Sequence, residues 1–472
     1  MSEPERTKNP FREIVQPFID LVHAPRALWG LNLNYCIEGF VYFGMVIYLA
    51  MYFNRHVQLD DQRAGWMVGV LTSGITISMF FFGGRADKWG VRRTLLLSLV
   101  SMLIGRVVLA GAPSLGLGGG AILSPLNLAA VLGILFVVLG YGMYQPAAYA
   151  AARQFSTEST ANMNYAMLYA LMNLGGWLPS FMSPIRERFG IPGAYWFYTL
   201  CTTAGLVLLA VILTQKTVTQ AIAAAKATTA EASGTKAAAA SSGATAAAAP
   251  ETAALGFFAR ALQWLRHHPL ADRKFAFFIF CLIPVQTLFA HNWLTLPLYV
   301  NRAFSGTWVG QRFETATSLN SLLIFILCPI VAALTRKTKV YTMMIVGTAI
   351  MAAPTFLLAL GPTVGGLFTF IVVMTIGEAI WQPRFLQYAA EIAPEGRTGA
   401  YMGVAQFPWF LTKVIVPIYS GWFLARYCPD PSTGRPQDTA TMWLIYACIA
   451  TTSTILLILA RGWVGKDFKS KS

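Results

Sequence analysis

A seven-residue motif that begins with glycine and ends with Gln-Pro occurs once in each half of this 472-residue chain, inside long apolar segments. The copies are Gly140-Tyr-Gly-Met-Tyr-Gln145-Pro146 and Gly377-Glu-Ala-Ile-Trp-Gln382-Pro383. A second pair, Met51-Tyr-Phe-Asn-Arg55 and Leu298-Tyr-Val-Asn-Arg302, has a similar separation of about half the chain. Motifs repeated at one separation indicate two structurally related halves. In membrane proteins, interrupted helices at corresponding positions of such halves point to a binding site between them.

The composition indicates a chain that lies mostly in a lipid bilayer. Hydrophobic residues make up 56% of the sequence and charged residues only 12%, about half the charged fraction of soluble proteins. Twelve apolar segments approach the roughly 20 residues that a membrane-spanning helix needs. They cover residues 28–53, 64–84, 94–111, 128–151, 163–185, 193–214, 275–300, 316–335, 340–360, 366–388, 399–425 and 440–461. Because backbone groups in lipid must bond within their own segment, we predict an all-α membrane protein with twelve transmembrane helices in two pseudo-symmetric six-helix bundles.

The net charge of +15 is concentrated in particular segments. The loops at 85–93 and 336–339 are basic, whereas the loops at 112–127 and 361–365 contain no Lys or Arg. Basic residues stay on the cytoplasmic side of a membrane. We therefore predict an integral protein of the plasma or bacterial inner membrane with both termini in the cytoplasm. The charge is interpreted as a topology signal, and no nucleic-acid partner is expected.

The predicted spans and a low-complexity stretch divide the chain into six regions. We predict a cytoplasmic amphipathic segment, an N-terminal six-helix bundle, a mobile cytoplasmic linker, an interfacial amphipathic segment, a C-terminal six-helix bundle and a cytoplasmic tail. In this order they cover residues 1–27, 28–214, 215–255, 256–274, 275–461 and 462–472. The linker is rich in Ala, Thr, Ser and Gly, and a segment with so few large apolar residues has little to bury.

The loop between the second and third predicted spans reads Gly83-Gly-Arg-Ala-Asp87-Lys88-Trp-Gly90-Val-Arg92-Arg93. It resembles the Gly-x-x-x-Asp-Arg/Lys-x-Gly-x-Arg-Arg signature of the major facilitator superfamily. Twelve spans with a central linker extend this resemblance over essentially the whole chain. The resemblance implies two six-helix bundles that rock about a central cavity, with Asp87, Arg92 and Arg93 in a cytoplasmic gating contact.

Within that superfamily, four segments are similar to motifs of the proton-dependent oligopeptide transporters. The segment from Glu38 to Met45 is similar to Glu-Arg-Phe-x-Tyr-Tyr-Gly-Met, and the segment from Leu168 to Gly176 is similar to Phe-Tyr-x-x-Ile-Asn-x-Gly-Ser. The fourth-span motif that ends at Pro146 and the tenth-span Gly377-Glu378 also have counterparts in the family. The resemblance implies a substrate in contact with Tyr42, Asn173 and Glu378, with Glu378 facing a substrate amino group.

The chain departs from that family at positions that are expected to hold a peptide carboxylate. Gly39 stands in place of the first-span arginine, Gln145 in place of the fourth-span lysine, and Tyr35 in place of the first acid of the first-span motif. A divergent relative with another small polar substrate is therefore a second interpretation. Lys413 in the eleventh span is a candidate replacement for the missing cation.

Ionisable residues inside the predicted spans indicate a site without reference to any family. Glu38, Arg106, His291, Glu378 and Lys413 all lie there, and a charged Arg, Lys or Asp at a helix centre costs about 2.5–3.5 kcal/mol to insert. Glu38 and Glu378 are the candidates for proton coupling, because a carboxyl group in low dielectric can exchange protons near neutral pH. A structural ion pair or a protonated, hydrogen-bonded acid is the alternative for both acids, and a structural role is the alternative for Arg106 and His291.

These observations combine into one predicted substrate site. It contains Tyr42, Gln145, Asn173, Trp177, His291, Glu378, Trp381, Gln382 and Lys413. For the two tryptophans, ordinary packing within the bundles is the alternative.

The sequence contains no phosphate-binding glycine-rich loop, no His-Glu-x-x-His motif and no extramembrane domain that could serve as an ATPase. We therefore predict a protein that is not an enzyme and has no cofactor or metal site. The predicted function is secondary active transport of a small polar solute, peptide-like or another metabolite, by proton-coupled alternating access. The alternatives are a drug or metabolite exporter of the same superfamily and, more remotely, a transporter-like sensor. The expected partners are the solute, protons and the lipid bilayer, and we expect a monomer.

Overall fold

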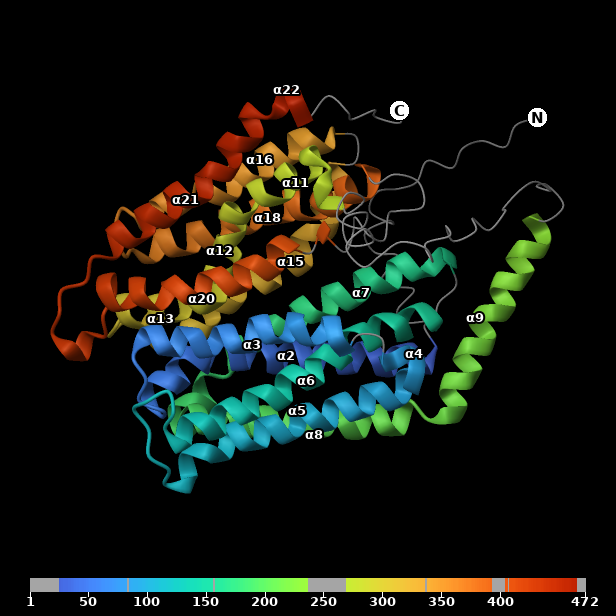
Figure 1. Cartoon of the computed structure of the whole chain (residues 1–472), viewed down its shortest axis with the longest axis horizontal. Coiled ribbons are helices and arrows are strands. Elements are labelled where there is room, and N and C mark those ends of the chain that lie inside the picture. The colour runs from blue at the N-terminus through green and yellow to red at the C-terminus, as the bar shows by residue number, and fades with distance from the viewer. Residues whose placement is uncertain are drawn as a thin grey trace, which may run out of the picture.

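The structure, a computed structural model, describes residues 25–82, 85–155, 158–236, 269–335, 338–392, 404–405 and 407–464. The regular elements in these residues are all helices. Figure 1 shows two groups of them, coloured blue to green and yellow to red, that pack against each other along their length. The predicted all-α fold with two bundles is confirmed.

The N-terminal bundle contains six long helices, one for each predicted span. They are α2 (Arg26–Arg55), α3 (Asp61–Phe82), α5 (Val91–Gly111), α6 (Pro125–Gln154), α7 (Glu158–Trp177) and α8 (Ser183–Ile212). The short helix α4 (Arg85–Trp89) lies between α3 and α5.

The C-terminal bundle follows the same plan, but its first span is divided into three consecutive helices. These are α11 (Arg273–Cys281), α12 (Ile283–Leu294) and α13 (Leu296–Ala303). Pro284 and Pro297 stand at the second positions of α12 and α13, where a residue without a backbone N–H interrupts the helical ladder. The remaining helices are α14 (Trp308–Gln311), α15 (Phe313–Leu334), α16 (Val340–Ala352), α17 (Thr355–Leu358), α18 (Val364–Ile392), α20 (Phe407–Tyr427), α21 (Thr439–Leu459) and α22 (Arg461–Val464).

Nine helical segments among the described residues are long and apolar enough to cross a membrane. The other three predicted spans are helical as well, and they correspond to α7, α15 and α20. The prediction of twelve spans therefore fits the structure.

The repeated glycine has the same packing role in both bundles. A Cβ atom on Gly140 of α6 would lie 2.7 Å from the carbonyl oxygen of Ser98 in α5. A Cβ atom on Gly377 of α18 would lie 2.3 Å from the backbone nitrogen of Met351 in α16. Because backbone atoms cannot move aside as a flexible side chain can, each glycine permits two helices to approach closely. The sequence repeat thus corresponds to equivalent helix pairs in two related bundles.

The predicted linker begins with a helix that the sequence analysis did not anticipate. Helix α9 (Gln215–Lys236) follows α8 and extends away from the bundles (Figure 1). The high helix propensity of alanine accounts for it. The rest of the linker, the two amphipathic segments up to residues 24 and 268, and the tail from residue 465 lie outside the described residues.

Candidate functional site

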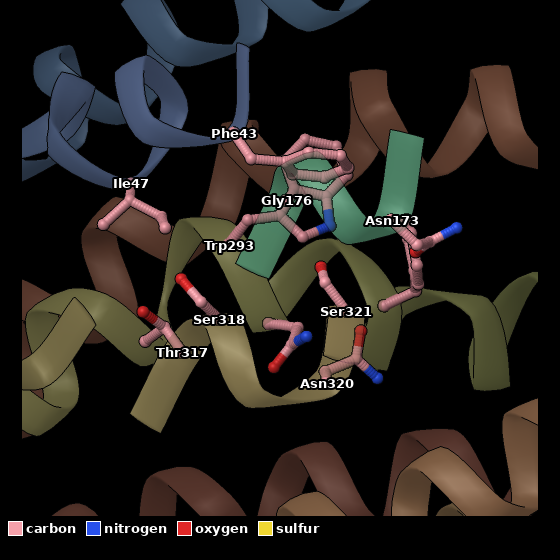
Figure 2. Close-up of a pocket in the computed structure, with 11 residues that line it drawn as sticks. Phe43, Ile47, Asn173, Gly176, Trp293, Thr317, Ser318, Asn320 and Ser321 are labelled. Atoms are coloured by element: carbon pink, nitrogen blue, oxygen red, sulfur yellow. The ribbon is translucent and has the colours of Figure 1, made fainter. Parts of the chain in front are cut away.

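A pocket lies between the two bundles, with walls from four helices. Helices α2 and α7 of the N-terminal bundle face α12 and α15 of the C-terminal bundle across it (Figure 2). The lining residues are Phe43, Ile47, Asn173, Gly176, Phe289, Asn292, Trp293, Thr317, Ser318, Asn320 and Ser321. Its position corresponds to the site between halves that the repeated motifs predict.

The pocket combines aromatic walls with uncharged polar groups. Figure 2 shows Phe43 and Trp293 in the upper part of the view and the polar side chains of α15 below them. Among the described residues, the structure gives no hydrogen-bond partner to three buried atoms of the lining: Oδ1 of Asn292, Nε1 of Trp293 and Oγ of Ser318. Buried polar atoms are nearly always paired, so these three are available to a solute or to water.

Glu378 lies directly behind the pocket wall. It is 1% exposed on α18, and one of its oxygens accepts a hydrogen bond of 2.9 Å from Nδ2 of Asn320. The same nitrogen donates to Oγ1 of Thr375 at 2.9 Å. With its nitrogen engaged twice, Asn320 has its amide oxygen left for the pocket. The side chain of Asn320 thus connects the buried carboxylate of Glu378 to the lining of the pocket.

Glu38, the other predicted proton-coupling acid, is part of a closed polar network inside the N-terminal bundle. Arg106 of α5 donates to both of its carboxylate oxygens at 2.8 and 2.9 Å, and Tyr141 donates at 3.1 Å. Arg106 also donates to Thr202 of α8 at 2.5 Å. Both charged side chains are almost completely buried. The structure therefore favours the structural ion pair that the sequence analysis left open for Glu38.

Two other predicted residues of the N-terminal bundle lie at or beside the pocket. Asn173 lines it, and its Nδ2 donates to the carbonyl oxygen of Tyr169 one turn earlier at 2.9 Å. Tyr42 precedes the lining residue Phe43, and its ring lies 5.1 Å from that of Tyr141. Gln145 on α6 and Trp177 at the end of α7 are partly buried and lie outside this pocket's lining.

His291 and Trp381 turn into the C-terminal bundle, away from the pocket. The two ring nitrogens of His291 lie 2.6 Å from Oγ1 of Thr295 and 2.9 Å from the hydroxyl of Tyr419, and its ring stacks on Tyr446. Trp381 donates from Nε1 to the sulfur of Met351 at 3.1 Å. These contacts match the packing alternatives for both residues.

Lys413 and Gln382 lie on helices that do not contribute to the pocket. Lys413 is on α20, where its backbone carbonyl accepts a hydrogen bond of 2.9 Å from Ser73 of α3, and Gln382 is a partly buried residue of α18. The structure does not bring either residue into the lining.

Of the predicted gating residues, Asp87 belongs to α4, whereas Arg92 and Arg93 belong to the first turn of α5. Arg92 donates from Nε to the carbonyl oxygen of Leu213 at 2.5 Å, and Arg93 is exposed. The side chain of Asp87 lies outside the described residues, so its predicted contact stays a prediction.

At one end of the molecule, which we call the closed end, side chains connect the two bundles. It contains residues 56–60, 178–182, 304–312 and 428–438. Glu314 of α15 is fully buried there and forms an ion pair with Arg186 of α8. Tyr48 and Ser183, also from the N-terminal bundle, donate to Glu314 at 2.9 and 3.1 Å.

In a second ion pair at the closed end, the C-terminal bundle supplies the base and the N-terminal bundle supplies the acid. Arg302 of α13 donates to both carboxylate oxygens of Asp61 in α3 at 2.6 and 2.7 Å. Beside it, Arg55 of α2 donates to Oδ1 of Asn301 at 3.0 Å. Each arginine closes one copy of the repeated Tyr-x-Asn-Arg sequence, so the two copies meet across the bundle interface. All ion pairs between the bundles among the described residues lie at this end.

The positive charge at the closed end affects a neighbouring loop. Burial raises the pKa of the Asp430 carboxyl, but hydrogen bonds from Ser432 and the charges of Arg302 and Arg55 lower it by more. Its pKa is therefore below the ordinary value, and Asp430 is ionised in the folded protein at neutral pH.

Sequence reasoning missed most of the pocket wall and both ion pairs between the bundles. Glu314 precedes the predicted start of its span at residue 316, so it is not among the ionisable residues that the sequence places inside the spans. The Asn-Arg repeats indicate duplication in the sequence, and their contact across the bundle interface is visible only in the structure. No group of three or more His, Cys, Asp or Glu among the described residues is placed to hold a metal ion.

Comparison with solved structures identifies the same fold in transporters. A peptide transporter of the POT family bound to sulfate has a TM-score of 0.67, 17% identity and coverage of 94% of this chain and 95% of its own. A POT family transporter bound to 5-aminolevulinic acid has a TM-score of 0.66 and 15% identity, with coverage of 93% and 97%. A mutant peptide transporter POT bound to alafosfalin has a TM-score of 0.68 and 17% identity, with coverage of 94% and 96%. At these identities the similarity concerns the fold.

Sequence comparison points to the same superfamily. An uncharacterized MFS-type transporter of Yersinia enterocolitica is 27% identical over 161 residues, and the match covers 34% of this chain and 38% of that protein. The chain therefore matches well under two thirds of that relative's length. The family model described as Major Facilitator Superfamily matches residues 26–417. With most of its length matched and the superfamily's two-bundle fold, this chain belongs to the major facilitator superfamily of membrane transporters.

Proposed function

We propose that this chain is a secondary transporter that moves a small polar solute through the pocket between its bundles by alternating access. One observation carries the proposal: both bundles line the pocket, while the ion pairs that join them are gathered at one end. A site shared by two bundles can be exposed to either side of the membrane if the contacts at each end open in turn.

The closed end is proposed to face away from the cytoplasm. The basic loop at 85–93 and Lys339, at the start of α16, are at the opposite end of the helices, and basic loops stay in the cytoplasm. In Figure 1 the bundles lie close together near α13 and diverge towards α4 and α22. This arrangement supports a state in which the pocket is shut off from the outside.

Proton coupling is proposed to use Glu378. Among the described residues, its carboxylate accepts a hydrogen bond from Asn320 and has no cationic side chain within ion-pair distance. Protonation of Glu378 would weaken the charge-assisted hydrogen bond from Asn320 and add an O–H donor, so it would change the hydrogen bonding of the pocket wall. Glu38 is less suited to this role because Arg106 occupies both of its oxygens.

The test uses proteoliposomes with a pH-sensitive dye inside and a panel of dipeptides, amides, nucleosides and sugars outside. We expect at least one solute to drive proton movement in the wild type. Glu378→Gln should abolish solute-driven proton movement while solute exchange continues. Glu38→Gln should reduce the amount of folded protein but should not change proton movement per folded molecule. Unchanged proton movement in Glu378→Gln would refute this coupling route.

Export of an amphipathic compound is a second candidate function, and the aromatic walls of the pocket favour it. Proton-driven flux in right-side-out and inside-out vesicles distinguishes the two directions. Import predicts accumulation in right-side-out vesicles with an inward proton gradient, whereas proton-driven export predicts accumulation in inside-out vesicles.

A further inference from the structure

We infer that the pocket accepts a neutral amphipathic solute that carries carboxamide or hydroxyl groups, and that it rejects a solute with a free carboxylate. This inference rests on the proposed transport function and narrows its substrate class. It differs from the peptide-like substrate that the sequence resemblance implies.

The first step is the charge of the lining. None of its eleven residues is Asp, Glu, Lys, Arg or His. A carboxylate that entered this space would lose its hydration and would meet no cation of the lining. Burial of an unpaired charge is strongly unfavourable, so a free carboxylate should lower the affinity of a solute.

The second step is the location of the basic side chains that could bind a carboxylate. Lys413, the candidate cation of the sequence analysis, is on α20 and does not belong to the lining. Arg106 is paired with Glu38 inside the N-terminal bundle. Arg186 and Arg302 are paired with Glu314 and Asp61 at the closed end. To reach a carboxylate in the pocket, each arginine would have to leave a buried acid without its counter-charge.

The third step is the hydrogen-bonding pattern of the wall. Asn292 presents an acceptor, Trp293 presents a donor, and the hydroxyl of Ser318 can act as either. Asn320 contributes a further acceptor, since its nitrogen is held by Thr375 and Glu378. A carboxamide both donates and accepts, so it matches this mixed set better than a group that only accepts.

The fourth step is the apolar side of the pocket. Phe43 and Phe289 line it together with Trp293, and the rings of Phe289 and Trp293 are 5.8 Å apart in an edge-to-face arrangement. Phe289 is held in turn by Trp409, at 4.4 Å between ring centroids. These rings can cover an apolar or aromatic part of a solute while the polar part faces α15.

The experiment compares two probes that differ only in the group at issue, N-acetyl-phenylalaninamide and N-acetyl-phenylalanine. Binding to the full chain in nanodiscs is measured by calorimetry at pH 7. We expect the amide to bind at least about tenfold more tightly than the acid, because the acid would place an unpaired charge in the pocket. Equal or tighter binding of the acid overturns the inference.

A variant links the binding to this pocket. Trp293→Phe keeps an aromatic ring and removes the Nε1 donor, so it should weaken binding of the amide by about threefold to tenfold. Trp308→Phe, at an exposed tryptophan of the same bundle, is the matched control and should bind like the wild type. Unchanged amide binding in Trp293→Phe overturns the inference.

Failure of both probes to bind also overturns the proposed substrate class. The transport function is judged separately, by the broad solute panel in the proteoliposome assay. A transported solute from that panel that requires its carboxylate would leave the function intact and refute only the substrate class.

Discussion

Replacing Arg186 by methionine should shift the transporter towards a state that is open at the closed end. The substitution keeps a long side chain and leaves Glu314 without its cation, buried and bonded only to Tyr48 and Ser183. Removing one partner of a buried ion pair costs about 3–5 kcal/mol. Since two hydroxyl donors remain and Arg186 itself is 14% exposed, we take the lower limit of about 3 kcal/mol.

That cost applies to the closed arrangement, because Glu314 gains water when the bundles separate at this end. An energy difference of about 3 kcal/mol corresponds to a population shift of roughly a hundredfold. The open state should therefore rise from a minor species to one that is readily detected.

The assay measures distances between spin labels by electron–electron double resonance in a cysteine-free background. Labels at the exposed positions Leu117 and Thr433 report on the N-terminal and C-terminal bundles at the closed end. Arg186→Met should add a longer-distance population. Arg188→Met is the control, since Arg188 is exposed and stacks over Phe189 of its own helix. The reasoning is refuted if Arg186→Met and the control give the same distance distribution as the parent.

Three further predictions concern stability and pH. Arg106→Met should destabilise the protein in detergent by about 3–5 kcal/mol, and adding Glu38→Gln should restore part of the melting temperature; additive losses would contradict a direct pair. Gly377→Val should greatly reduce folded yield, because the new Cβ would meet backbone atoms of α16, whereas Gly365→Val, with open space around it, should fold normally. The pKa of Asp430 is lowered by folding, so its contribution to stability is present above the unfolded value of about 3.9 and is lost as the pH falls through the folded value. Melting temperatures of Asp430→Asn and the wild type should thus converge in acid, and a constant difference down to pH 3 would disprove this.

The architecture could be predicted from the sequence because its signals are local. A run of apolar residues of sufficient length specifies a membrane-spanning helix wherever it occurs. The repeated glycine motif placed α6 and α18 at equivalent positions before any contact was known. Even so, helix α9 was missed, because its sequence has few large apolar residues to bury and indicates a helix only through the propensity of its alanines.

The site was harder to predict from the sequence, because the hydrogen-bond and ion-pair partners of a side chain depend on which helix faces pack together. Glu38 and Glu378 look alike as single acids in apolar spans, yet one lies against Arg106 of α5 and the other against the amide of Asn320. Asn292 and Trp293 line the pocket, while His291, their neighbour, points into the bundle. Successive side chains of an α-helix point in directions about 100° apart, so neighbouring residues can face different environments.

The sequence by itself thus determined that the chain forms two related helical bundles in a membrane, with polar groups at the depth of the bilayer. Only the tertiary structure decided which charges pair within a bundle, which pairs join the bundles at the closed end, and which uncharged groups remain to line the pocket. The physical reason is that a sufficiently long run of apolar residues specifies a membrane-spanning helix by its local composition. The free energy of a charged side chain, in contrast, depends on the groups that lie within a few ångströms of it in the folded protein.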